Sequence, residues 1–351
     1  MMPLNASPRP YRAVALRPLA CLAVSACLSS AAVAAQAQAT DTATTAKPPS
    51  AASAVFQILA SELALQQGQV GVALATYVAL AERTRDAGVA ERATRVALTA
   101  RQPRQALRAG AVWLETAPDN TDAQDVVDLL RLQFGFYTDL RNNLTQRKAQ
   151  AQKAGTLDAF LERLAGLAAQ GQDAAKSLAV LEGVADTDQN RPNLLYARAM
   201  LNERMQDHKA MEGLLRALIA QQPGHAHAKN ALGYSLADRG IRLDEAEALI
   251  EEAHQLLPED AHILDSMGWL YFRKGELDKA VQWLSDAHRR QPDAEISAHL
   301  GEVLWALSRR EEANAVFRLG LAHDPNNTVL KGTLQRLGIA LESLSESAKA
   351  R

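Results

Sequence analysis

Two histidines are the first residues in this sequence whose type and spacing could do chemistry. His225 and His227 form an H-x-H pattern, and paired imidazoles are common metal ligands. A metal site needs further ligands, and the sequence after the Pro223-Gly224 turn supplies none at a suitable spacing. We therefore interpret both histidines as solvated side chains at the start of a helix, and we expect no metal.

A run of carboxylates is the second chemical candidate. Closely spaced carboxylates can act as general acid and general base, and one segment carries Glu245, Glu247, Glu251 and Glu252. The segment is amphipathic and rich in alanine, which indicates the solvated face of a helix instead. The sequence has no G-x-S-x-G, no G-x-x-x-x-G-K-[ST], no H-E-x-x-H and no cysteine pair at metal spacing. We predict that the protein is not an enzyme and uses no cofactor.

The elements that hold these residues are predicted by a register that recurs down the C-terminal half. A small residue is followed by two more near offsets 12 and 19 and by a proline near offset 24. The register begins again after 35 and then 33 residues, and a period near 34 in helix-forming sequence is the signature of the tetratricopeptide repeat. The markers are Gly233, Ala246, Ala253 and Pro258; Gly268, Ala280, Ala287 and Pro292; and Gly301, Ala313, Gly320 and Pro325.

The unit from Ala261 to Asp293 is the most regular. Helices that cross closely need a residue with almost no side chain at the crossing, and Gly268 and Ala280 are predicted to meet there. Pro292 is expected to end the second helix. The segment resembles the repeat consensus at Leu264, Gly268, Tyr271, Ala280, Leu284, Ala287 and Pro292. This predicts an all-α solenoid, a right-handed superhelix of helix–turn–helix repeats.

The remaining units define the predicted domains. Residues 191–345 are predicted to form the regular array, ending in a capping helix over 328–341. One unit of this array carries an extra residue around Gly240-Ile241-Arg242, which a loop tolerates. Residues 54–190 are predicted to be degenerate repeats, with helices that lack a secure register between 120 and 190. The predicted units begin near Ala54, Ala87, Pro192, Ala226, Ala261 and Ala294.

The N-terminal residues have the layout of a bacterial secretory signal over 1–34, with arginines before an apolar run. Two processing sites fit. One is an A-x-A site ending near Ala34 or Ala37, and the other is a lipobox-like Val24-Ser25-Ala26-Cys27, in which Cys27 carries a lipid. Residues 35–53, rich in Thr, Ala, Gln and Pro, are predicted to be a flexible linker. We expect a periplasmic protein, which the lipid would anchor to the outer membrane.

Composition narrows the classes of partner. The chain has 38 basic and 40 acidic residues and no polybasic cluster, which argues against nucleic acid. Cys21 and Cys27 are the only cysteines, so a disulfide framework is excluded. Hydrophobic residues make up 48% of the chain and aromatic residues only 5%, which is typical of closely packed Ala-rich helices. Beyond the signal, no apolar run reaches the ~18 residues of a membrane span, so we expect membrane contact only through the lipid.

Protein-binding residues are predicted from the register, because stacked units form a groove lined by the first helix of each unit. Tyr, Trp and Arg often anchor protein interfaces. The alternative for Trp269 and Trp305 is that they wedge neighbouring units together. The predicted groove residues are Asn230, Tyr234, Asp238, Asp265, Trp269, Phe272, Arg273, Glu302 and Trp305.

Four short segments carry a resemblance to a known family. They are residues 230–234 (NALGY), 264–269 (LDSMGW), 299–305 (HLGEVLW) and 89–94 (VAERAT). They resemble an exported proteobacterial tetratricopeptide family, whose best understood type is the lipoprotein adaptor of a periplasmic carboxy-terminal processing protease. The resemblance implies a scaffold that brings cell-wall hydrolases to the protease and so affects peptidoglycan remodelling. Two alternatives remain: a component of an envelope export or outer-membrane assembly machine, and a hydrolase with its site in the irregular middle.

Overall fold

The computed structural model of this chain describes residues 50–341 and 344. The predicted secretory signal, the lipidation candidate Cys27 and the predicted linker up to residue 49 lie outside the described residues. Within that part the fold is entirely helical, apart from its turns and one short 3₁₀ segment, Asp186–Asp188. The α-helices are α1 Ala51–Gln66, α2 Val70–Thr84, α3 Ala87–Thr99, α4 Pro103–Thr116, α5 Thr121–Gln133, α6 Tyr137–Ala154, α7 Leu157–Gln170, α8 Ala174–Ala185, α9 Pro192–Arg204, α10 His208–Gln221, α11 Ala226–Asp238, α12 Leu243–Leu256, α13 Ala261–Arg273, α14 Leu277–Arg290, α15 Ala294–Ala306, α16 Arg310–His323 and α17 Thr328–Arg336.

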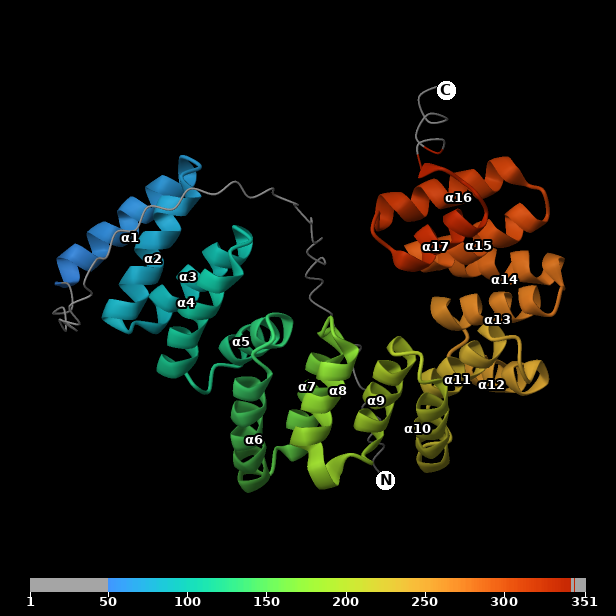
Figure 1. Cartoon of the computed structure of the whole chain (residues 1–351), viewed down its shortest axis with the longest axis horizontal. Helices are drawn as coiled ribbons and strands as arrows, with labels where there is room; N and C mark the ends of the chain where they lie inside the picture. Colours follow the sequence, from blue (N-terminus) through green and yellow to red (C-terminus); the bar gives the residue numbers. More distant parts are fainter. Residues whose placement is uncertain (1–49, 342–343, 345–351) are drawn as a thin grey trace, which may run out of the picture.

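The helices pair in chain order into antiparallel hairpins, from α1 with α2 to α15 with α16, and the hairpins stack along an open arc (Figure 1). The first helices of successive hairpins also contact each other: α11 contacts α13, and α13 contacts α15. The interior is a series of apolar clusters shared between neighbouring hairpins, not one central core. This is the predicted tetratricopeptide-type solenoid.

Short polar side chains start many of the helices. The Asp260 carboxylate accepts hydrogen bonds from the backbone N–H groups of His262 and Ile263, and Asp293 does the same one unit later. These contacts satisfy donors that the first turn of a helix leaves free. Pro192 opens α9, where the missing N–H costs nothing.

Glycines stand where the two helices of a unit cross. A Cβ atom added at Gly268 would lie 2.5 Å from Leu284 Cγ and 3.1 Å from the Ala280 carbonyl oxygen. Added at Gly233, it would lie 2.6 Å from Ile250 Cγ1, and at Gly301 it would collide with the Phe317 ring. The recurring small residue of the sequence register is therefore a close-packing position, as predicted.

Two predicted boundaries were wrong. Helix α1 begins at Ala51, three residues before the predicted start of the repeats at Ala54, because the Ser50 hydroxyl accepts a hydrogen bond from Ser53 N–H and caps the helix. The terminal helix α17 ends at Arg336 and not at residue 341. Gly338 has a φ of 68°, and Ile339 N–H donates back to the Leu334 carbonyl, which closes the helix.

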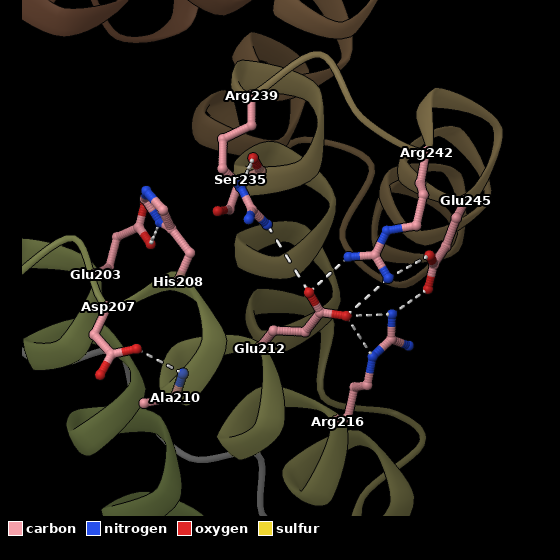
Figure 2. A network of polar contacts seen from close by, with 10 residues as sticks. All are labelled: Glu203, Asp207, His208, Ala210, Glu212, Arg216, Ser235, Arg239, Arg242 and Glu245. Atoms are coloured by element: carbon pink, nitrogen blue, oxygen red, sulfur yellow. Dashed lines mark hydrogen bonds and ion pairs between the residues drawn. The ribbon is translucent and has the colours of Figure 1, made fainter.

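A polar network ties the α9–α10 unit to the α11–α12 unit (Figure 2). Arg242 donates two hydrogen bonds to Glu212, at 2.9 and 2.6 Å, and Arg216 donates to the same carboxylate at 2.9 Å. Side-chain hydrogen bonds from Arg242 lower the pKa of Glu212 to about 2. Arg242 belongs to the turn with the extra residue, so the insertion supplies a contact between units.

The middle of the chain joins its helices differently. Asp128 of α5 is buried and forms ion pairs with Arg147 of α6 and Arg131. Lys148, also buried, forms an ion pair with Asp188 at 2.8 Å. Helix α6 is longer than its neighbours, at 18 residues. Because ion pairs hold these helices at several contacts, the small-residue register is weak here.

Candidate functional site on the first helices of the C-terminal units

Helices α11, α13 and α15 carry all the predicted groove residues and lie side by side. We call the surface that they present together the first-helix face. Its centre is a cluster of side chains from all three helices: Tyr234, Asp238, Asp265, Trp269 and His299. The cluster decides which of the predicted residues are free to meet a partner.

His299 and Asp265 form the buried centre of this cluster. The Nδ1 atom of His299 lies 2.9 Å from Asp265 Oδ2 and 3.0 Å from Oδ1, and the two residues are 2% and 5% exposed. Burial alone would lower the pKa of His299, but the Asp265 carboxylate outweighs it and raises that pKa. The imidazolium and the carboxylate therefore hold α15 against α13.

Trp269 completes the buried part. Its ring stacks on His299 at a centroid distance of 4.3 Å, and its Nε1 donates to Asp238 Oδ1 at 3.0 Å. The residue is 5% exposed. Of the two interpretations of Trp269, the structure supports the wedge between units. The prediction that Asp265 and Trp269 are open groove residues was wrong, because both side chains are buried in contacts between repeats.

Tyr234 sits at the border of the cluster. Its hydroxyl lies 3.4 Å from His299 Nε2. Burial, followed by the nearby carboxylates Glu295, Asp265 and Asp238, raises the pKa of Tyr234 well above its usual value. We interpret the arrangement as a support for the helices.

On α11 and α13, four predicted residues besides Tyr234 retain exposed surface. Asp238 is exposed, and Asn230, Phe272 and Arg273 are exposed at least in part. The Asn230 Oδ1 atom is itself buried and has no hydrogen-bond partner among the described residues. Arg273 donates to the carbonyl of Asp238 at the end of α11. These side chains form a mixed polar and aromatic border around the buried cluster.

The two predicted residues on α15 are engaged with other elements. Glu302 accepts a hydrogen bond from Arg336 of α17 at 2.7 Å, and its side chain is 14% exposed. The guanidinium of Arg310 lies 3.7 Å from the centroid of the Trp305 ring, a cation–π contact. Glu302 therefore fastens the terminal helix, and Trp305 is partly covered.

Sequence reasoning missed His299 and Glu295 as members of the face. His299 lies two positions before its crossing glycine, whereas Asn230 and Asp265 lie three positions before theirs, so the register did not mark it. The available signal was a histidine inside the apolar helix Ala294–Ala306. Burial raises the pKa of Glu295, one helical turn before His299.

The residues that the sequence offered as candidates for metal binding or catalysis make structural contacts. His225 accepts a hydrogen bond from Ala228 N–H through Nδ1, stacks on Tyr196 at 5.4 Å and has a pKa lowered by burial. It is half-buried and caps α11, so only His227 is exposed as expected. The glutamates of α12 meet cations: Glu245 with Arg216, Glu247 with Lys274 and Glu252 with Lys229.

Other kinds of site were sought in the same residues. Over residues 50–341 and 344, no three His, Cys, Asp or Glu side chains gather as metal ligands. None of the helices in this part has both the length and the apolar character to cross a bilayer. A hollow of about 310 Å³ lies beside α3, and none of the predicted groove residues lines it.

The family comparison agrees with the hairpin architecture. A family model described as tetratricopeptide repeat matches residues 241–300, which include α13 and its crossing Gly268. This chain is a tetratricopeptide-repeat protein. The matched residues also contain most of the buried cluster of the first-helix face.

Curated and solved relatives of this tetratricopeptide-repeat protein point the same way. It is 43% identical over 203 residues to a TPR repeat-containing protein of Pseudomonas aeruginosa, covering 53% of this chain and 34% of the relative. It is 30% identical over 132 residues to tetratricopeptide repeat protein 21B of Xenopus laevis, covering 37% of this chain and 10% of the relative. The chain thus spans about a third of the length of the bacterial relative.

Among solved structures, a tetratricopeptide repeat protein from Parabacteroides merdae superposes with a TM-score of 0.50 at 17% identity. The alignment covers 71% of this chain and 97% of that one. At this identity the likeness concerns the fold alone.

Proposed function

We propose that this tetratricopeptide-repeat protein is a non-enzymatic adaptor that binds other proteins through the first-helix face. The observation that carries the proposal is the contrast between a rigid buried cluster and the open side chains around it. His299, Asp265 and Trp269 fix the helices, while Phe272 and Arg273 remain accessible at the border. Preorganised aromatic and arginine side chains are the usual anchors of protein interfaces, because they lose little freedom on binding.

The proposed place of action is the periplasm, and the proposed partner is a carboxy-terminal processing protease to which the adaptor presents cell-wall hydrolases. The secretory layout of residues 1–34 supports export. The resemblance of the four short sequence segments to the adaptor family, and the 43% identity to a Pseudomonas relative, support a bacterial adaptor. Lipidation at Cys27 would keep the adaptor at the outer membrane.

A pull-down from solubilised envelope tests this function with the full-length protein as bait. The groove variant is Phe272→Ala with Arg273→Ala, which keeps every side chain of the buried cluster but removes the Phe272 ring from Trp269 and the Arg273 bond to the Asp238 carbonyl. The matched control is Leu319→Ala with Arg289→Ala, an exposed leucine and arginine on α16 and α14. Circular dichroism melts of all three proteins would confirm equal folding.

The expected result is that wild type and control recover a carboxy-terminal processing protease and the groove variant does not. Recovery of export or assembly-machine components without a protease would favour the alternative function. Equal recovery of the protease by the groove variant would show that the partner binds elsewhere on the solenoid.

A further inference from the structure

The first hairpin is unusual for the end of a solenoid. Between Ala51 and Glu82, the only charged residues are Glu62 and Glu82, whereas 22% of the whole chain is charged. Terminal repeats of solenoids normally present a polar outer face to water. At the other end, α17 meets this need with charged residues such as Lys331 and Arg336. The α1–α2 hairpin, residues 51–84, has only three charged residues for this role, Glu62, Glu82 and Arg83.

The exposed side of α1 is a continuous apolar face. Its large members are Val55, Phe56, Leu59 and Leu63, with exposures of 56%, 72%, 63% and 54%. Ala52 and Ala60 are exposed between them, and Val72 of α2 adds a residue that is 62% exposed. The opposite side of α1 buries Ser61 and Ala64 against α2. A helix that is apolar around its circumference is normally buried on both sides.

We propose that this α1 face is the contact between two copies of the chain, with α1 antiparallel to its equivalent about a twofold axis. In the rest of the solenoid, a first helix packs on the second helix of the preceding unit, as α3 does on α2. Helix α1 has no preceding unit in the described residues, and its equivalent in a second copy fills that place. The two α1–α2 hairpins then form a four-helix contact.

The absence of charge on this face favours a second copy of the chain over other occupants. In a twofold contact each side chain meets the same surface again, so a charge near the axis would face a like charge. The exposed side of α1 has no charge, because Glu62 is turned to Arg92 and bonded to it at 2.8 Å. A lipid surface is disfavoured, because membrane-binding helices carry free Lys or Arg beside the apolar face, whereas the two arginines beside α1 are bonded to it, Arg83 to Gln57 and Arg92 to Glu62.

The size of the face suits a weak and specific dimer. Its exposed apolar side chains amount to roughly 500–600 Å² per copy, so pairing would bury about 1,100 Å² in total. This exceeds the ≈ 1,000 Å² below which an interface is hard to distinguish from chance packing, and it falls short of the standard size. We therefore expect a weak dimer in exchange with the monomer.

The dimer does not rest on the proposed adaptor function, because α1 and the first-helix face lie at opposite ends of the arc (Figure 1). Its consequence is bivalence. A dimer presents two first-helix faces at a fixed separation, and a partner with repeated binding sites would be held by both.

Analytical ultracentrifugation of the full-length protein tests the dimer directly. Wild type should show a concentration-dependent dimer, and Phe56→Glu with Leu59→Glu should weaken it at least about tenfold. The matched control is Leu319→Glu with Leu256→Glu, two leucines that are 54% and 45% exposed on α16 and α12. The control should dimerise like wild type. A wild type that stays monomeric at about 100 µM, or a glutamate variant that still dimerises, would overturn the proposal.

Disulfide cross-linking tests the geometry. With both native cysteines replaced by serine, Leu59→Cys near the middle of the face should oxidise to a covalent dimer, because a disulfide requires Cα atoms within about 7 Å. Leu319→Cys should remain monomeric. Failure of Leu59→Cys to cross-link above the Leu319→Cys background would contradict the antiparallel contact. Flotation of wild type, but not of the glutamate variant, with phospholipid vesicles would identify a lipid surface as the occupant and overturn the dimer.

Discussion

His299 donates a hydrogen bond from Nδ1 to Asp265, 34 residues earlier in the chain, and this contact joins α15 to α13 inside the first-helix face. Asp265 raises the pKa of His299 above its usual value of 6.5 in spite of burial. A raised pKa in the folded state stabilises the fold fully below the unfolded pKa, and this contribution is lost as pH rises through the folded value. The free energy of unfolding should therefore fall as pH rises from about 6.5 into the alkaline range.

The measurement is a series of urea unfolding curves across this range, for wild type and for His299→Gln. Glutamine keeps a hydrogen-bond donor and removes the titration, so the variant should lose most of the slope with pH. His227→Gln, at an exposed histidine of α11, serves as the control and should keep the slope. The same slope in His299→Gln and wild type would show that another group titrates.

Glu212 gives a pH dependence of opposite sign. Arg242 and Arg216 lower its pKa from 4.5 to about 2. A lowered folded pKa stabilises the fold above the unfolded value, and this contribution is lost as pH falls from about 4.5 towards 2. Glu212→Gln should cost on the order of 1 kcal/mol at pH 7, because part of the network faces solvent. Thermal melts at pH 7 and pH 3 should show a larger deficit at pH 7 than at pH 3.

A double-mutant cycle of Glu212→Gln and Arg242→Ala isolates the contact between the two units. A coupling energy indistinguishable from zero would show that the inserted turn does not lock the repeats together.

Two glycines should respond to the same substitution with opposite signs. Gly268→Ala places a Cβ 2.5 Å from Leu284 Cγ, and this overpacking should cost about 1–3 kcal/mol. Gly213 lies within α10 and would meet nothing within 4 Å, so Gly213→Ala should stabilise by up to about 1 kcal/mol through helix propensity. Chemical unfolding of both variants checks the contrast. A neutral Gly268→Ala would refute its role as a crossing position.

The fold was predictable because close helix crossings demand small residues, and these recur with the repeat. Gly233, Gly268 and Gly301 all occupy such crossings. The middle helices gave no register, since Asp128 and Lys148 hold them through ion pairs that have no period. The end of α17 was missed because Gly338 closes the helix after only nine residues. The early closure depends on a local backbone conformation, not on the hydrophobic pattern.

The site was predictable only in outline. The register placed the predicted residues on helices α11, α13 and α15, which lie side by side, but it could not tell an exposed aromatic residue from one buried between units. Trp269 and Tyr234 occupy the same register position, one residue after the crossing glycine, yet Trp269 is buried and Tyr234 is partly exposed. His299 contacts both side chains, stacking on Trp269 and lying 3.4 Å from the Tyr234 hydroxyl, and no periodic pattern marks it.

The last prediction separates the structural aromatic residue from the binding one. Trp269→Ala removes a ring that is 5% exposed, together with its hydrogen bond to Asp238, and should cost about 3–5 kcal/mol. Trp269→Phe keeps the stacking on His299 and loses the indole N–H, so its cost should be clearly smaller. The Phe272 side chain is partly exposed. Phe272→Ala should therefore change the melting temperature less than Trp269→Ala does, while weakening partner capture more. If Trp269→Ala left the melting temperature unchanged and abolished capture, Trp269 would be a contact residue, and the buried cluster would not be the support that positions the first-helix face.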